Sequence, residues 1–242
     1  MKANNLLIIS SALLLLLCWW NRNHLPADMR LVPELASEPR QTRASKTGFE
    51  ASFKGVDYAI TPQYDYELYG LVVSFRHHDG NSRMHRQSND HLNMLDVCVL
   101  WGDTAASPLL NEITFWNGIF TCNVQTRDQA AWDAFDIYEL SNNHLISDDP
   151  RLREKLRDIR IGDQIRVRGY LASYASANGG TRGTSTTRLD TGDGACETIY
   201  VQEFDIVRKA SNFWRSGMYV SLLMLLAGLL IHFIRPYRPH KN

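Results

Sequence analysis

The order of apolar and polar residues predicts a β-rich central region between two continuous apolar segments. Residues 6–20 and 213–234 are apolar almost throughout, so a helix built from either would be apolar on every face. Between them, apolar and polar residues alternate in several runs with the period of two that is typical of strands. We therefore expect a mainly β domain flanked by an N-terminal and a C-terminal helix.

The clearest strand pattern lies at residues 161–171. One parity is apolar and the other polar or aromatic, with Gly169 at a bend: Ile165, Val167 and Leu171 against Arg166, Arg168 and Tyr170. This alternation predicts a strand with one buried face. In the run at residues 197–207 the apolar parity slips by one residue near Gln202 and Glu203, which predicts a β-bulge.

Three further strand-like runs come earlier in the chain. Residues 64–75 place Tyr69, Leu71, Val73 and Phe75 on one parity, and residues 92–102 place Leu95, Val97, Val99 and Trp101 together. Residues 113–124 form the third run, with Gly118 marking a bulge or a close approach. Residues 128–140 fit a helix or a strand, and we expect the polar residues 141–144 to turn the chain.

A short helix is predicted between the third and fourth strands. Asp149 is a suitable N-cap, Pro150 suits the first helical position, and Leu152 and Leu156 form a one-sided apolar stripe. Three strands, a helix and two strands is the order of the oligonucleotide/oligosaccharide-binding (OB) superfamily, and residues 64–207 resemble it in this pattern. The resemblance implies a five-stranded OB-like barrel with a short helix between strands three and four.

The two apolar segments indicate membrane anchors. Residues 213–234 are long enough to span a bilayer and contain Arg215 as their only charge. Residues 6–20 would form a helix of only about 22 Å, at about 1.5 Å per residue. For this first segment, a signal peptide is therefore an alternative to a membrane anchor. A basic tail after residue 235 favours a cytoplasmic C-terminus. We expect two transmembrane helices, with both termini on the cytoplasmic side and the central domain periplasmic or extracellular.

These features predict five segments. They are an N-terminal anchor or signal-like segment at 1–20, an extended linker at 21–63, an OB-like domain at 64–210, a transmembrane helix at 211–235 and a basic tail at 236–242. Residues 21–212 carry a net charge of −5, while the two ends carry +5. An acidic domain opposes a polyanion, so the charge disfavours nucleic acid as a partner.

Two long polar segments, residues 76–91 and 175–196, join strands one to two and four to five. The OB resemblance implies that these connections border a ligand-binding face. Arginine forms planar, paired hydrogen bonds with carboxylates, which makes the second loop a candidate binding segment. The candidate ligand-binding residues are Arg182, Arg188, Asp190, Tyr170 and Arg168.

Histidines and cysteines give two further expectations. The first loop offers imidazole and carboxylate ligands for zinc or copper, from His77, His78, Asp79 and His85, although solvated loop histidines explain the same residues. Outside the first anchor there are three cysteines, so one pair is expected to be oxidised in an oxidising compartment: the candidates are Cys98, Cys122 and Cys196.

Two functional hypotheses follow. The first is a non-enzymatic binding or scaffold module of a bacterial-type cell envelope, anchored in the cytoplasmic (inner) membrane, needing no cofactor and binding a protein, peptide or glycan. Its partners would be the membrane and a protein of an envelope assembly. The alternative is a metal-dependent hydrolase or nuclease that uses the loop acids, arginines and histidines.

Overall fold

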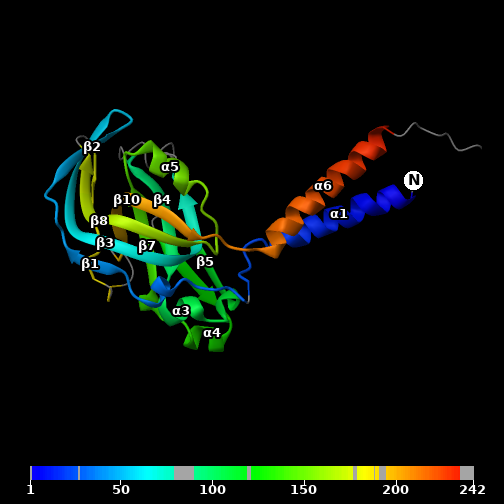
Figure 1. Ribbon diagram of the computed structural model, residues 1–242, viewed down its shortest axis with the longest axis horizontal. Coiled ribbons are helices and arrows are strands. Elements are labelled where there is room, and N and C mark those ends of the chain that lie inside the picture. The colour runs from blue at the N-terminus through cyan, green and yellow to red at the C-terminus, as the bar shows by residue number, and fades with distance from the viewer. Residues whose placement is uncertain are drawn as a thin grey trace, which may run out of the picture. The chain divides into compact units, whose positions relative to one another are not determined.

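The computed structural model describes residues 2–26, 28–78, 90–118, 121–176, 179–187, 189–190 and 195–234. The chain divides into two compact units: the terminal segments 1–26 and 211–242 form a helical unit, and residues 27–210 form a central unit. The central unit is mainly β, and the helical unit contains the two apolar helices, in agreement with the sequence pattern (Figure 1).

The helical unit consists of helix α1 (Lys2–Trp20) and helix α6 (Phe213–Ile234), both long and apolar enough to cross a membrane. They pack in antiparallel directions, because a Cβ atom on Gly228 would lie 2.9 Å from Ile8, near the start of α1, and one on Gly217 would lie 2.9 Å from the Cys18 sulfur, near its end. The Asn4 side chain also donates to the Gly228 carbonyl at 3.1 Å. Small residues thus allow close helix approach without lost packing.

Polar contacts join the two helices where they meet the chain of the central unit. The Asn212 amide donates to the Arg22 and His24 carbonyls, each at 2.9 Å, and its Oδ1 accepts from the Arg215 backbone N–H at 3.2 Å. The Arg215 guanidinium adds a 2.9 Å bond to the Arg22 carbonyl. Asn212 therefore caps α6 and ties its start to the end of α1.

The main sheet of the central unit is built from strands that pair in the order β1, β3, β4, β7, β10, β8, β9, with β2 also paired to β3. A further pairing joins β3 to β8, so that the path β3–β4–β7–β10–β8 returns to its first strand. Only β7 and β10 run parallel among the pairings of the described residues. The strands are β1 (Arg40–Arg43), β2 (Phe49–Phe53), β3 (Val56–His77), β4 (Asn93–Leu100), β7 (Leu140–Ile146), β8 (Gln164–Ser176), β9 (Thr181–Arg182) and β10 (Glu197–Arg208).

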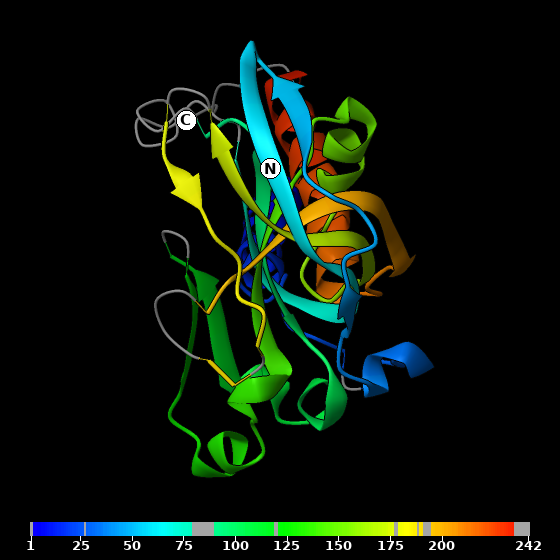
Figure 2. The same cartoon turned by 90° about the vertical axis from the view of Figure 1, so that its left-hand side faces the viewer.

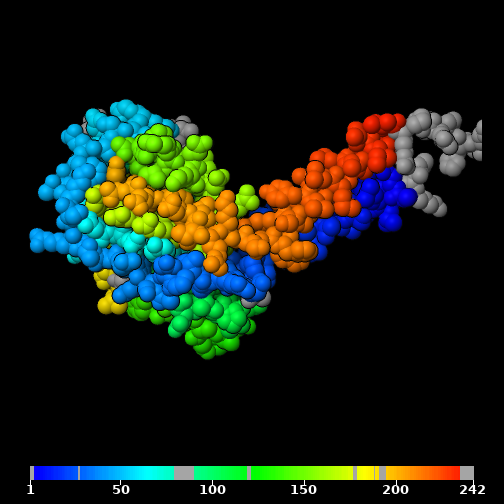
Figure 3. All heavy atoms as spheres, viewed as in Figure 1, coloured from blue at the N-terminus to red at the C-terminus, as the bar shows by residue number. Residues whose placement is uncertain are grey.

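Strand β3 is much longer than predicted, and the expected linker at 21–63 is largely structured. Figures 1 and 2 show β3 curving across the sheet, and β1 and β2 pair with its first half, between Val56 and Glu67. The short helix η1 (Pro33–Ala36) buries Leu35 completely. Just before it, the Val32 N–H donates to the Gln164 side chain at 2.7 Å, and Figure 3 shows this blue segment lying against the strands. Pro33 occupies the first turn of η1, a position in which proline is favoured.

Of the parity predicted for residues 64–75, Phe75 packs against the main core, while Leu71 and Val73 are buried outside that cluster. Tyr66, Leu68 and Val72 face the main core, and the register shifts between Val72 and Ser74, so that Phe75 packs against the same core. This bulge moves one apolar residue from the opposite parity into the core, and the sequence shows only a continuous apolar run at that point.

The predictions for β4, β8 and β10 were confirmed. In each of the three strand regions, the apolar residues that were predicted to share one face lie in the main core: Leu95, Val97, Val99 and Trp101; Ile165, Val167 and Leu171; Ile199, Val201 and Phe204. The β10–β8 register shifts between Val201 and Glu203, where the bulge was expected. A Cβ atom on Gly169 would lie 2.0 Å from the Tyr200 carbonyl, so only glycine permits this close approach of β8 to β10.

Helix α5 (Pro150–Leu156) also forms as predicted. The Asp149 carboxylate accepts from the Arg151 N–H at 2.8 Å, and Leu152 and Leu156 are buried in the main core. Pro150 occupies the first turn, where its missing N–H costs no helical hydrogen bond.

The third predicted strand was wrong. Residues 113–124 belong instead to β5 (Ile113–Asn117) and β6 (Cys122–Thr126), a separate two-stranded sheet. The strand between β4 and β10 is β7, built from the polar residues expected to turn the chain. Short helices precede and follow β5 and β6 in the chain: α3 (Gly102–Ala106), η2 (Leu110–Glu112), α4 (Gln129–Asp133) and η3 (Ile137–Glu139).

One disulfide joins the β5–β6 hairpin to the main sheet. It links Cys98 in β4 to Cys122 at the start of β6. The Ser74 hydroxyl also donates to the Asn117 Oδ1 at 2.6 Å. These contacts attach the β5–β6 hairpin to β3 and β4, and they leave Cys196 outside the pair.

The packing of β8 gives a stability prediction. Leu171 is 1% exposed and Leu189, in the second loop, is 77% exposed, so the same truncation tests burial alone. Leu171→Ala should lower the free energy of unfolding by about 2–5 kcal/mol, and Leu189→Ala by less than about 0.5 kcal/mol. Chemical denaturation of the detergent-solubilised protein, followed by tryptophan fluorescence, measures both. Equal losses would contradict the assignment of β8 to the core.

Candidate functional site

A buried carboxylate, Asp96 in β4, lies at the centre of a polar cluster on the sheet. Asp96 is fully buried and sits opposite His144 of β7 in the strand register. Its Oδ1 is 2.5 Å from His144 Nδ1, and its Oδ2 is 2.7 Å from His78 Nε2, one residue past the end of β3. The Asn93 amide donates a third bond to Oδ1 at 2.9 Å. Three hydrogen-bond donors therefore converge on the Asp96 carboxylate.

These hydrogen bonds set the charge of the carboxylate. Burial by itself would raise the pKa of Asp96, but the hydrogen bonds from His144 and His78 outweigh burial, and the pKa lies well below its usual range. An ionised carboxylate only accepts hydrogen bonds, so Nδ1 of His144 and Nε2 of His78 carry the protons that point to it. Asp96 therefore fixes the orientation and the tautomer of both rings, as carboxylates do for histidines in catalytic and metal sites.

Asn142 and Cys196 lie beside this histidine pair. Asn142 shares the His144 side of β7, two residues earlier, and its amide donates to the Cys196 sulfur at 3.2 Å. Burial raises the pKa of the Cys196 thiol despite that hydrogen bond. A nucleophilic cysteine needs a lowered pKa, so the geometry favours a neutral thiol that packs in the cluster.

Two contacts join the ends of the two long loops near β8. The Tyr174 hydroxyl donates to Asp90 Oδ1 at 2.7 Å, and Arg182 Nη1 lies 3.9 Å from Asp90 Oδ2. Asp90 closes the first loop, and Arg182 belongs to β9 in the second. Burial and the neighbouring Asp90 carboxylate raise the pKa of Tyr174, so its hydroxyl stays protonated and keeps donating.

A partly buried arginine holds the end of the first loop. Arg153 Nη2 of α5 donates to the carbonyls of His91, Leu92 and Ser147, each at 2.9 Å, and its guanidinium lies 3.7 Å from the centre of the Phe53 ring. Burial lowers the pKa of Arg153 to about 10, which leaves it charged at neutral pH. Charge-assisted bonds to three carbonyls fix the backbone where the loop returns to β4.

The structure does not bring the predicted ligand-binding residues together. Arg168 is exposed and pairs with Glu203 at 3.1 Å on the outer surface of β8 and β10. Tyr170 is 8% exposed and packs edge-on to Phe49, and its hydroxyl accepts from the Gln202 amide at 3.2 Å. Among the described members of the predicted set, Arg182 lies at the junction of the two loops.

The remaining predicted residues fall in or beside the described parts of the loops. Asp190 accepts from the Ser185 hydroxyl at 2.6 Å, and Arg188, Asp79 and His85 lie outside the described residues. His77 is exposed and packs edge-on to Phe75, while His78 turns to Asp96. Across the part of the chain that the structure describes, no group of three or more His, Cys, Asp or Glu side chains has the arrangement of a metal site.

Sequence reasoning missed Asp96, Asn142 and His144. Asp96 interrupts the apolar run of β4, and a charged residue inside such a run is a signal of a partnered or functional site. The residues of β7 resemble a turn because serine and asparagine favour turns locally. Their partners, Asp96 and Glu197, lie far away in the sequence.

Replacement of Asp96 tests the cluster. Asp96→Asn keeps the shape but removes the charge, and it should destabilise the fold by about 3 kcal/mol, since one carboxylate oxygen becomes an amide NH2 that cannot accept a hydrogen bond from a histidine. The exposed Asp158→Asn is the matched control and should cost less than about 0.5 kcal/mol.

The same pair of variants gives a pH dependence. Because the folded pKa of Asp96 is lowered, its stabilisation is complete above the unfolded pKa of about 4 and is lost as the pH falls through lower values. The stability gap between wild type and Asp96→Asn should narrow below about pH 4. A gap that widens on acidification would contradict an ionised Asp96.

Comparison of the chain with protein-family models, with curated proteins and with solved structures found no match. The function is therefore argued from the chemistry of the residues themselves.

Proposed function

We propose that this protein is a membrane-anchored, non-enzymatic binding module of a bacterial-type cell envelope. In this proposal the two apolar helices span the cytoplasmic membrane, and an OB-like domain faces the non-cytoplasmic side. It binds a protein, peptide or glycan through the junction of its two long loops. The observation that carries the proposal is the antiparallel pairing of α1 and α6, which start and end the same central unit.

The pairing order of the strands supports the OB-like barrel. In chain order the members of the cycle β3–β4–β7–β10–β8–β3 are β3, β4 and β7, then helix α5, then β8 and β10, and the parallel pair joins β7 to β10. The close approach at Gly169 and the bulge beside it allow the sharp bending that closure of a small barrel requires.

The helix pair and the disulfide support the topology. Antiparallel spans bring both chain ends to one side of a bilayer and leave the central unit on the other. Disulfides persist in oxidising compartments, which agrees with a Cys98–Cys122 bond in a periplasmic or extracellular domain. The basic tail favours a cytoplasmic C-terminus.

The position of the polar cluster supports binding at the loop junction. In OB domains the face of strands two and three, with the loops one–two and four–five, receives the ligand. Here these elements are β4 and β7, which carry Asp96 and His144, and the loops that meet at Asp90 and Arg182. The side chains at the loop roots are fixed, which lets the loops present a preorganised surface.

Nested fusions test the topology. Alkaline phosphatase should be active when fused after Ala210 and inactive when fused after Asn242, because the enzyme folds only outside the cytoplasm. Green fluorescent protein at the same two positions should give the opposite result. Phosphatase activity from the Asn242 fusion would contradict the antiparallel transmembrane pair.

Site-specific photocrosslinking tests the binding surface. A photoreactive phenylalanine analogue in place of Leu189, exposed in the second loop, should give a discrete crosslinked product in cells after irradiation. The same analogue at Glu50, exposed on β2, is the matched control and should give none. Equal products from both positions would place partner contact elsewhere.

A further inference from the structure

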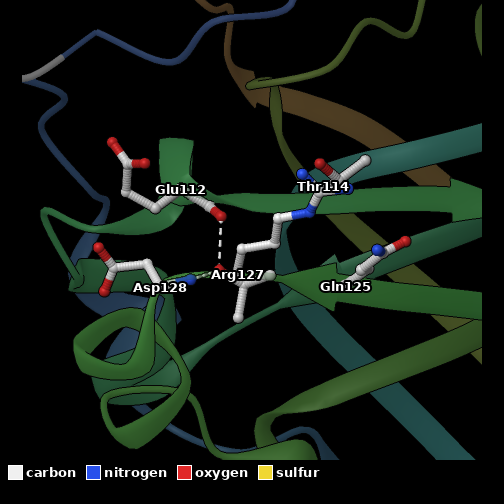
Figure 4. A pocket seen from close by; sticks show the side chains of 6 residues that line it. Glu112, Thr114, Gln125, Arg127 and Asp128 are labelled. Atoms are coloured by element: carbon white, nitrogen blue, oxygen red, sulfur yellow. Dashed lines mark hydrogen bonds between the residues drawn. The ribbon is translucent and has the colours of Figure 1, made fainter.

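The β5–β6 hairpin borders a hollow of about 500 Å³ that lies apart from the histidine–aspartate cluster. Its lining is polar and comes from the hairpin and the start of α4: Glu112, Thr114, Gln125, Thr126, Arg127 and Asp128. In Figure 4 the carboxylates of Glu112 and Asp128 lie on one side, the Gln125 amide lies on the other, and the Arg127 side chain extends toward Thr114 between them.

Several of these side chains have no partner among the residues that the structure describes. Among the described residues, Thr114, Gln125 and Arg127 make no side-chain hydrogen bond or ion pair. The hairpin itself is held by its backbone ladder and by the Thr126 hydroxyl, which donates to the Glu112 carbonyl at 2.7 Å. The hairpin therefore does not need these polar groups for its own structure, and they remain available to a ligand.

An exposed indole continues the same face of the hairpin. Trp116 is 43% exposed and lies two residues after Thr114, so both side chains project from one face of β5. Two strand residues advance by about 7 Å, which is close to the length of one sugar ring. Across the ladder, Asn123 faces Trp116 and Gln125 faces Thr114.

The charge and polarity of the hollow select the class of ligand. One arginine and two carboxylates give a formal charge of −1, which disfavours an anion, and the polar lining disfavours an apolar ligand. A neutral sugar satisfies both conditions. Its C–H faces pack on an aromatic ring, and its hydroxyls both donate to carboxylates and accept from amide and guanidinium groups.

We propose that this face of the hairpin is a second binding site, for a neutral oligosaccharide. One sugar ring stacks on Trp116, and the next ring enters the hollow, where Gln125 and Arg127 donate to its hydroxyls and Glu112 accepts from them. This site does not depend on the binding surface at the two long loops.

Calorimetric titration tests the proposal. The full-length protein, in a detergent whose headgroup is not a sugar, is titrated with cellotetraose and with the tetramer of N-acetylglucosamine, and at least one should bind. Trp116→Ala should weaken binding at least about tenfold, as loss of a central aromatic contact does. Trp132→Ala is the matched control, because Trp132 is 49% exposed on α4 and does not line the hollow, and binding should stay unchanged.

Gln125→Ala provides a second variant, since Gln125 is exposed and makes no contact that the fold needs. It should weaken binding several-fold and leave the melting temperature unchanged. Failure of the wild-type protein to bind either tetrasaccharide, equal losses in Trp116→Ala and Trp132→Ala, or tighter binding of the acidic tetragalacturonate would each overturn the proposal.

Discussion

The constraint on which the central unit depends is that a polar side chain on a buried strand is costly unless it finds a partner. Strand β7 lies between β4 and β10, and it carries polar side chains on both of its faces. On one face, His144 bonds to Asp96; on the other, the Ser141 hydroxyl donates to the buried Glu197 at 2.9 Å. An unpaired polar group in such a place costs as much as several good contacts contribute. The polar strand therefore specifies its two neighbours more strictly than an apolar strand would, because only these neighbours supply the matching groups.

The same contacts determine where the two long loops begin and end. The first loop starts at His78, which bonds to Asp96, and it returns at Asp90 and His91, held by Tyr174 and Arg153. The second loop leaves β8 through the β8–β9 pairing and ends at Cys196, beside Asn142. Loops that are fixed at their roots while their tips vary are the usual way in which a rigid sheet carries a binding surface. The cluster thus serves a positioning role, which agrees with its burial and with the neutral thiol of Cys196.

Strand β4 connects the two proposed sites. Asp96 and Cys98 lie two residues apart and project from one face of β4: the first orients the histidines, and the second forms the disulfide with Cys122, next to the turn of the β5–β6 hairpin. The hairpin is consequently attached to the main sheet by a covalent bond next to the cluster. The two surfaces differ in chemistry, since the loop junction combines arginine, aspartate and tyrosine, while the hairpin combines an exposed indole with amide and guanidinium groups that have no partner among the described residues.

The sequence by itself determined the features that depend on neighbouring residues. The terminal helices follow from the length of two apolar runs. Helix α5 follows from Asp149, Pro150 and its leucines. The core face of β8 and β10 follows from the alternation of apolar residues with a period of two, and the bulge follows from the shift of that alternation by one residue. Tertiary structure decided the rest, because the physical causes lie far apart in the chain. Asn142 and His144 favour a turn locally, and they form a strand because Cys196 and Asp96 supply their hydrogen-bond partners. The pairing of Cys98 with Cys122 depends on where the hairpin folds. Arg182 lies near Asp90 because β3 and β8 pair.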